Sequence, residues 1–397
     1  MDIYKFPRNF LWGVAISSYQ TEGNNLNSDW CTWEKLGKIE DGSSSGRACD
    51  FYHRYQEDID LAKKMNLNSF RLSIEWSRIE PTKGKFNEKE IEHYKNVLLY
   101  LKKNNFKVFL TLWHFTLPNW LAEIGGWENR KSIFYFCRYT EKIVKNFSDL
   151  VDFWITLNEP VMYTGSAYLT GIWPPEKRSL FNAIKVFNHL VKAHKKAYQI
   201  IHRLIPQAQV GLAQNVVYFH APQNPIDQHL SWIFNFFYNK LFYLLTKKDH
   251  DFIGLNYYYS YLVSNLRLAK KLRRLAVRSL KKKYIKVEIY PKGIYRVIKM
   301  FKKYNLPIYI TENGLDDESD QKRPTFIREH LKWLHYGIKK GIDIRGYLYW
   351  SLIDNFEWQE GFEPRFGLIE VDYQTLERKP RQSAWLYAKI AKNNGFI

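Results

Sequence analysis

The sequence has few cysteines and no long apolar run, so it lacks the features of disulfide-rich secreted proteins and of membrane-spanning chains. Among its 397 residues are only three cysteines, Cys31, Cys49 and Cys137, without CxxC or Cys/His metal spacing. This pattern argues against a disulfide framework and against a zinc site. No run reaches the ~18 apolar residues of a membrane-spanning helix, and the first residues lack the basic start and apolar stretch of a signal peptide. We therefore expect a cytoplasmic protein that binds no metal.

Acidic residues are also scarce, with 40 Asp and Glu against 60 Lys and Arg, which gives a formal net charge of +20. Such a charge attracts anionic surfaces, including nucleic acid and phospholipid headgroups. A nucleic-acid-binding surface would interleave basic and aromatic residues, whereas most aromatic residues here fall in apolar runs and at their ends. We expect no nucleic-acid partner, and a solvated basic surface is the simplest interpretation.

Eight short apolar runs alternate with helical patterns along the chain. The runs cover residues 10–17, 69–76, 107–114, 152–159, 209–215, 251–258, 307–314 and 344–355. Between them, apolar residues recur every three or four positions, as in 89–104, 132–147, 181–204 and 325–340, which is typical of amphipathic helices. The alternation predicts an α/β fold with a parallel sheet, and eight units predict a closed (β/α)₈ TIM barrel. No Gly/Ser-rich or Pro-rich linker interrupts it, so we expect residues 1–397 to form one domain.

Two of the runs end in a glutamate followed by turn residues, ITLNEP with Glu159 and IYITENG with Glu312. Barrel enzymes build their active sites at the carboxyl ends of the strands. Hydrolysis of an acetal needs one carboxylic acid to protonate the leaving oxygen and one carboxylate to attack or to activate water. A lone glutamate here could simply close a strand, but two on different strands, each beside an asparagine, favour a two-carboxylate hydrolase. A sugar-binding barrel that has lost catalysis is the alternative, although both carboxylates are present.

Segments in almost the whole chain resemble glycoside hydrolase family 1, the retaining β-glucosidases and β-galactosidases. In family order they are FLWGVAISSYQTEG, FRLSIEWSRIEP, LWHFTLPNWL, TLNEP, DFIGLNYY, IYITENG and YLYWSLIDNFEWQEGFEPRFGLIEVDY. The resemblance implies a (β/α)₈ barrel with no cofactor. It also implies an exo-acting enzyme that removes terminal non-reducing β-D-glucosyl or β-D-galactosyl residues from a small-molecule β-glycoside through a covalent glycosyl-enzyme intermediate.

By the same resemblance Glu159 is the acid/base and Glu312 the nucleophile, and Arg71 lies beside Glu312 and keeps it ionised. Two carboxyls about 5 Å apart suit this division, because an ionised carboxylate raises the proton affinity of its neighbour. Asn158 is expected to bond the sugar 2-hydroxyl, with a helix or turn cap as the alternative.

Further site residues follow from the resemblance alone. The residues that align with those binding the remaining sugar hydroxyls are Gln20, His114, Glu357 and Trp358. Trp350 aligns with the aromatic floor of the sugar site, and Tyr258 with a phenol near the nucleophile. Asn256 and Phe366 align with supporting positions. Taken singly, His114 could be a satisfied barrel histidine and Trp350 a core residue. A carboxylate at Glu357 would repel a phosphate on the sugar, so we expect unphosphorylated sugars.

The chain departs from the family pattern in places that affect what the sugar is attached to. The stretch from Asn215 to Asp251 is short, and Val287 and Phe115 stand where many members carry tryptophans. Residues 266–284 carry nine basic and no acidic residues, with leucines at roughly helical spacing. This segment is either a solvated helix on the barrel rim or a basic amphipathic helix that docks on an anionic membrane and brings the site to glycolipids.

Overall fold

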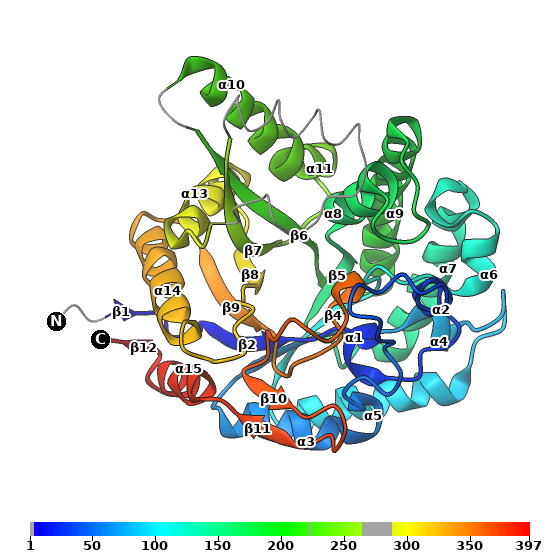
Figure 1. The fold of residues 1–397 in the computed structure, drawn as a ribbon, viewed down its shortest axis with the longest axis horizontal. Helices are drawn as coiled ribbons and strands as arrows, with labels where there is room; N and C mark the ends of the chain where they lie inside the picture. Colours follow the sequence, from blue (N-terminus) through cyan, green and yellow to red (C-terminus); the bar gives the residue numbers. More distant parts are fainter. Residues whose placement is uncertain (1–3, 222–223, 264–287) are drawn as a thin grey trace.

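Eight parallel strands close into a barrel, in the order in which they follow one another along the chain (Figure 1). The structure is a computed structural model that describes residues 4–221, 224–263 and 288–397. The barrel strands are β2 (Leu11–Ala15), β3 (Ser69–Ser73), β4 (Lys107–Thr111), β5 (Phe153–Asn158), β6 (Gln209–His220), β7 (Ile253–Leu262), β8 (Ile308–Glu312) and β9 (Ile344–Trp350). The predicted barrel and all eight predicted strands are confirmed, although most strands end sooner than expected and β6 and β7 run on.

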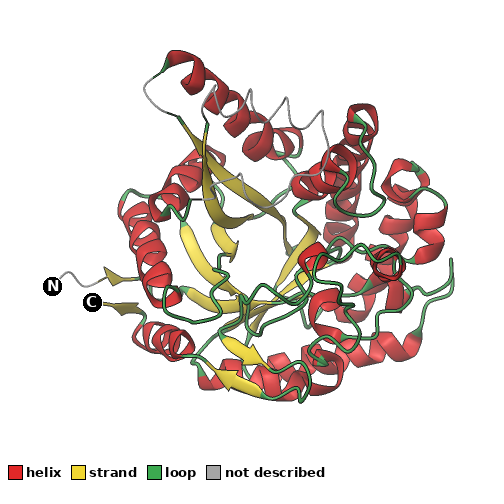
Figure 2. Ribbon diagram, in the orientation of Figure 1, coloured by secondary structure: helices red, strands yellow, loops and turns green. Residues whose placement is uncertain are grey.

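Helices surround the barrel on its outside (Figure 2). The α-helices are α1 (Ser18–Glu22), α2 (Asp29–Lys35), α3 (Phe51–Lys64), α4 (Trp76–Ile79), α5 (Glu88–Lys103), α6 (Asn119–Glu123), α7 (Lys131–Phe147), α8 (Pro160–Thr164), α9 (Leu180–Leu204), α10 (Pro225–Phe234), α11 (Leu241–Leu245), α13 (Pro291–Phe301), α14 (Arg323–Lys339) and α15 (Gln382–Asn393). Short 3₁₀ or π-helical turns are η1 (Gly126–Glu128), η2 (Gly165–Thr170), η3 (Asn235–Lys240), η5 (Lys302–Tyr304) and η6 (Trp358–Glu360). The four helices quoted from the sequence begin and end within two residues of the predicted bounds.

Helix α5 shows why these segments are helical. The Asn87 side chain accepts a hydrogen bond from the Lys89 amide and so caps the first turn, which also carries Glu88 and Glu90. Lysines occupy the last turn. This arrangement places negative charge at the positive end of the helix dipole and positive charge at the other end.

The barrel interior is filled by side chains, so it is a packed core and no channel. A buried cluster of inward side chains closes its lower part: Phe109, Ile155, Ala213, Phe252, Tyr309 and Leu348. Phe109 and Phe153 stack with ring centroids 4.2 Å apart. Because side chains alternate along a strand, polar residues that point inward two or more positions later lie above this cluster, at the carboxyl ends.

Two small antiparallel sheets complete the fold. Strand β1 (Tyr4–Lys5) pairs with β12 (Gly395–Phe396), which brings the two ends of the chain together. Strand β10 (Ile369–Val371) pairs with β11 (Arg378–Pro380), which follows it in the chain.

Strands β6 and β7 continue past the barrel as a two-stranded parallel ribbon (Figure 1). Their pairing extends to His220 opposite Leu262, whereas β5 stops pairing with β6 at Ala213. The helical run α10, η3 and α11 follows β6, and α10 and η3 lie against the ribbon.

Candidate active site

The two glutamates singled out in the sequence lie at the same end of the barrel. Glu312 is the last residue of β8. Glu159 directly follows β5, with φ of 43°, in the left-handed region that glutamate rarely adopts, and Pro160 then starts α8. Both side chains are buried.

Glu312 is held between a cation and a phenol. Arg71 Nη1 donates to Glu312 Oε1 at 2.5 Å, and Tyr258 Oη donates to Oε2, also at 2.5 Å. Burial raises the pKa of Glu312 above its ordinary value, while Arg71 and the Tyr258 hydrogen bond lower it. Burial and the charge of Glu312 raise the pKa of Tyr258 well above its usual value, so the phenol keeps its proton and stays a donor.

Among the residues that the structure describes, no cation lies in hydrogen-bonding contact with Glu159. Its Oε1 accepts from Asn256 Nδ2 at 2.7 Å and from Asn215 Nδ2 at 3.1 Å. Burial first, and then the negative charge of Glu312, raise the pKa of Glu159 to about 8. Arg71 therefore offsets the cost of burying the charge at Glu312, whereas at Glu159 the neighbouring carboxylate adds to that cost.

Asn158 and Asn256 connect the two glutamates. Asn158 Oδ1 accepts from Arg71 Nη2 at 2.7 Å and from Asn256 Nδ2 at 3.2 Å. Asn256 lies opposite Glu312 in the register of β7 and β8, and its Oδ1 accepts from Thr311 Oγ1 at 2.7 Å. Arg71 can only donate, so Asn158 Oδ1 must be the acceptor and Asn256 Nδ2 the donor to it, which fixes the orientation of both amides.

The network also sets the tautomer of His114. Because Asn158 Oδ1 is an acceptor, its Nδ2 is the donor to His114 Nε2 at 3.0 Å, and the imidazole proton is on Nδ1. Burial and the nearby Arg71 hold the pKa of His114 well below its usual value, so the ring is neutral. Among the described residues His114 Nδ1 is buried without a hydrogen-bond partner, which leaves it free to donate to a bound hydroxyl.

A second polar group involves Gln20 and Glu357. Gln20 Nε2 donates to Asn355 Oδ1 at 2.8 Å and to Glu357 Oε2 at 3.2 Å. Trp350 Nε1 donates to Glu357 Oε1 at 3.2 Å. Burial raises the pKa of Glu357 to about 8, so this carboxyl is mostly protonated at neutral pH in the free protein.

Aromatic rings connect this group to the rest of the site. The His114 ring lies 6.0 Å from the rings of Trp350 and Trp358, nearly parallel to both. Phe366 meets Tyr258 edge to face at 6.1 Å. The structure therefore brings together all twelve residues named from the sequence.

Comparison with known proteins agrees with this geometry. The model for "Glycosyl hydrolase family 1" matches residues 3–244 and 226–396. The chain belongs to glycosyl hydrolase family 1.

Family relatives match over nearly their full length. The chain is 34% identical to β-glucosidase A of Thermotoga maritima, covering 100% of this chain and 99% of that protein. It is 31% identical to a β-galactosidase of Pyrococcus woesei, covering 98% of each. The solved structure of a β-glycosidase from Pyrococcus horikoshii superposes with a TM-score of 0.90 at 36% identity, covering 100% of this chain and 97% of that one.

The expected shortening of the stretch from Asn215 to Asp251 stays a prediction, although the chain as a whole is shorter than its relative. The alignment with the Thermotoga protein runs over 444 residues against 397 in this chain, so that relative carries segments that are missing here. The two parts of the family match meet at residues 226–244, within this stretch. What remains of it forms the end of β6 and the run α10, η3 and α11.

The predicted aromatic substitutions have different outcomes. Phe115 is buried and packs against Trp173 and Trp358, at centroid distances of 4.8 and 5.2 Å, so it supports the site from behind. Val287 and the basic segment 266–284 lie outside the described residues, and docking through that segment stays a prediction.

Asn215 and Tyr238 belong to the site but have no role in the sequence-based assignment. Asn215 ends a predicted strand, and this position at a strand end could have marked it as a site residue. Tyr238 Oη donates to Asn215 Oδ1 at 2.8 Å and lies in η3, where no sequence motif marks it.

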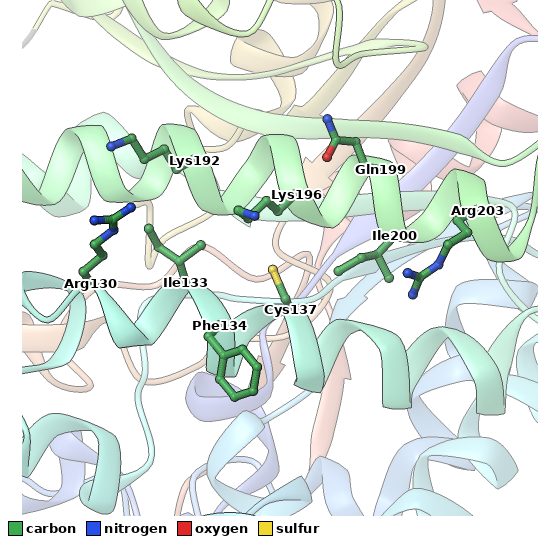
Figure 3. Close-up of a pocket in the computed structure, with 9 residues that line it drawn as sticks. All are labelled: Arg130, Ile133, Phe134, Cys137, Lys192, Lys196, Gln199, Ile200 and Arg203. Carbon is green, nitrogen blue, oxygen red and sulfur yellow. The ribbon is translucent and has the colours of Figure 1, made fainter.

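A separate hollow lies away from these residues, on the outside of the barrel between α7 and α9 (Figure 3). Its volume is about 460 Å³, and its lining consists of Arg130, Ile133, Phe134, Cys137, Lys192, Lys196, Gln199, Ile200 and Arg203. None of these residues ends a barrel strand, so the hollow plays no part in the two-carboxyl site.

Two features are absent from the described residues. No helix in them is long and apolar enough to cross a membrane. In the same ranges no three His, Cys, Asp or Glu side chains are grouped to hold a metal ion.

Proposed function

We propose that this family 1 β-glycosidase is exo-acting and retaining, and that it removes terminal non-reducing β-D-glucosyl or β-D-galactosyl residues. The observation that carries the proposal is the unequal environment of two buried carboxyls at one end of the barrel. Glu312 is paired with Arg71 and Tyr258, while Glu159 has a pKa of about 8. A retaining mechanism needs one ionised and one protonated carboxyl.

In the first step, an oxygen of Glu312 attacks the anomeric carbon while Glu159 gives its proton to the departing glycosidic oxygen. The product is a glycosyl ester of Glu312 and a free aglycone. Tyr258 and Arg71 donate hydrogen bonds to Glu312 and so hold its carboxylate in position for the attack.

Formation of the ester also changes the role of Glu159. The negative charge of Glu312 is one of the two main causes of the raised pKa of Glu159, and the ester carries no charge. The pKa of Glu159 then falls, and the carboxylate accepts a proton from the water that hydrolyses the ester. The same pair of residues thus serves both steps.

The sugar-binding part of the site offers several hydrogen-bonding groups. His114 Nδ1 donates, and Asn158 Nδ2 has one hydrogen left after its bond to His114. Gln20 and Glu357 together present donors and acceptors on the other side. A hydroxyl-rich ligand such as a hexose fits this arrangement.

The expected preference for unphosphorylated sugars takes a different physical form here. Glu357 is mostly protonated at neutral pH, so charge repulsion is weaker than the sequence suggested. Its described contacts, Gln20 and Trp350, are neutral. A phosphate group bound next to Glu357 would find no cation among these contacts. Its negative charge would also raise the free-energy cost of ionising Glu357.

Azide rescue tests the assignment of the two carboxyls. With an aryl β-glycoside that has an activated leaving group, Glu159→Ala should be rescued by azide and yield the β-glycosyl azide, because azide replaces water in the second step. Glu312→Ala should yield the α-glycosyl azide, because azide replaces the nucleophile. The reverse pattern, or full activity of Glu312→Ala without azide, would contradict the roles.

Product stereochemistry tests retention separately. Proton NMR of the wild-type reaction should show the β-anomer before mutarotation, and an α-anomer at first appearance would exclude retention. A wild-type protein that cleaves no member of a panel of aryl β-glycosides would instead support the sugar-binding alternative.

A further inference from the structure

The run α10, η3 and α11 differs from an ordinary surface helix in that a stripe of polar residues forms its buried face. Asp227, Ser231, Asn235 and Asn239 recur every fourth residue and are all buried. This spacing places them on one face of the run. In most surface helices that face is apolar.

The unpaired edge of β6 explains the polar stripe. Within the described part of the chain, no strand pairs with this edge on the β5 side beyond Ala213. Asn239 donates to the Val217 carbonyl at 2.8 Å and accepts from the Val217 amide at 2.9 Å. Asn235 Nδ2 and Ser231 Oγ donate to the Phe219 carbonyl at 2.7 and 2.6 Å. The side chains thus supply the hydrogen bonds that a neighbouring strand would otherwise make.

These hydrogen bonds fix the rotation of the run and leave five of its apolar residues exposed, while Phe242 and Tyr243 of α11 are buried. We call the exposed set the outer face; it consists of Ile226, Trp232, Phe237, Leu244 and Leu245. Trp232 is 60% exposed and Phe237 is 56% exposed. From 225 to 245 the only residues with charged side chains at neutral pH are the buried Asp227 and Lys240.

Helix α9, which packs against α11, carries exposed apolar residues of its own. The buried Phe242 of α11 contacts Phe187 of α9 with ring centroids 5.5 Å apart. The first turns of α9 carry Leu180, Phe181 and Ile184, all exposed, with Phe181 at 76%. Exposed apolar residues gathered on one element, as on the outer face, mark an interaction site in soluble proteins.

We propose that the outer face docks on an anionic lipid surface. The formal charge of +20 attracts such a surface and repels a second copy of the same chain. Lys240 ends η3 within the run, and the exposed Lys247 and Lys248 follow α11 directly. An aromatic, apolar face flanked by lysines is the pattern of helices that lie in the membrane interface without crossing it.

The location of the run gives docking a consequence for the enzyme. Tyr238 of η3 bonds Asn215, which bonds Glu159, so the run lies beside the catalytic end of the barrel. A protein docked through the outer face holds its active site close to the lipid surface. This proposal concerns binding and does not depend on the proposed reaction.

Vesicle flotation tests the proposal. The wild-type protein should float with vesicles of phosphatidylcholine and phosphatidylglycerol at low salt, less at high salt, and weakly with pure phosphatidylcholine. The double variant Trp232→Ser/Phe237→Ser should bind the anionic vesicles at least about tenfold more weakly. Trp385→Ser is the matched control, since Trp385 is 50% exposed on α15, away from the outer face, and it should bind as the wild type does.

Several outcomes would overturn the proposal. They are no flotation of the wild type at low salt, equal binding of the double variant, or an equal loss in Trp385→Ser. A wild-type dimer in gel filtration that the double variant abolishes, without vesicle binding, would instead assign the face to a second copy. Hydrolysis of a soluble aryl glycoside should be unchanged in the variants, which verifies folding, and Trp232→Ser alone replaces the double variant if the latter does not fold.

Discussion

Replacing Glu159 by glutamine should make the protein more stable at alkaline pH while it loses its acid catalyst. The side chain is buried, and its pKa is raised to about 8 by burial and by Glu312. Glutamine has nearly the shape of the protonated carboxyl and keeps an oxygen that can accept from Asn256 and Asn215. The variant therefore preserves the neutral form of the site and removes only the ability to ionise.

The sign of the stability effect follows from proton linkage. Below pH 4.5, the ordinary value for this group, Glu159 is protonated in both the folded and the unfolded chain, and its ionisation adds nothing. As the pH rises toward 8, the unfolded chain releases the proton first, so the wild-type protein loses stability across this window. Above pH 8 the loss reaches its limit, on the order of 5 kcal/mol from the size of the pKa change.

Urea unfolding at pH 5 and at pH 8.5 measures this effect. Glu159→Gln should gain several kcal/mol in free energy of unfolding over the wild type at pH 8.5 and much less at pH 5. Glu123→Gln, at an exposed glutamate of α6, is the matched control and should differ little from the wild type at either pH. A difference for Glu159→Gln that stays constant between the two pH values would refute the reasoning.

The same variant has a kinetic signature. Its rate should fall by about 10² to 10⁴ for a glycoside whose leaving group needs a proton. The fall in the first step should be much smaller for a leaving group that departs unprotonated, as measured by the burst of a dinitrophenyl glycoside. In the wild type the alkaline limb of kcat/KM should have an apparent pKa near 8, since this limb reports the acid of the free enzyme.

Two further predictions concern the nucleophile and its loop. Tyr258→Phe removes the 2.5 Å hydrogen bond to Glu312, and we expect kcat/KM to fall by about 10- to 100-fold in steady-state assays with little change in Tm; an unchanged kcat/KM would show that the phenol does not position the nucleophile. Gly314→Ala would place a Cβ atom 1.7 Å from the Trp350 carbonyl oxygen, so the loop after β8 must move, and we expect a lower Tm and much lower activity. Gly165→Ala, where a Cβ meets nothing within 4 Å, is its control, and equal effects of the two substitutions would contradict the steric argument.

The sequence predicted the barrel well because strands of a closed parallel barrel are buried on both faces. Such strands are continuous apolar runs, and ITLN and IYIT show this in β5 and β8. The two glutamates proposed as catalytic were singled out for the same reason, since a polar residue at the end of an apolar run is easily seen. The ends of the runs were less accurate, because loop residues such as those after β9 are apolar and buried as well.

The extension of β6 and the run that covers it could not be predicted in the same way. The hydrogen bonds that allow β6 to continue to His220 come from Ser231, Asn235 and Asn239, which lie far along the chain from Val217 and Phe219. Helical periodicity alone assigns the apolar residues of this run to the core. Only the free edge of β6 shows that the polar stripe is the buried one.

The two glutamates show most clearly what sequence cannot supply. Each ends an apolar run beside an asparagine, and nothing local in ITLNEP or IYITENG says which one carries the proton. The difference comes from Arg71, which bonds Glu312 and lies on β3, far from both motifs in the chain. Burial raises the pKa of both carboxyls, while Arg71 and the Tyr258 hydrogen bond lower that of Glu312, which favours the proposed roles of Glu312 as nucleophile and Glu159 as acid.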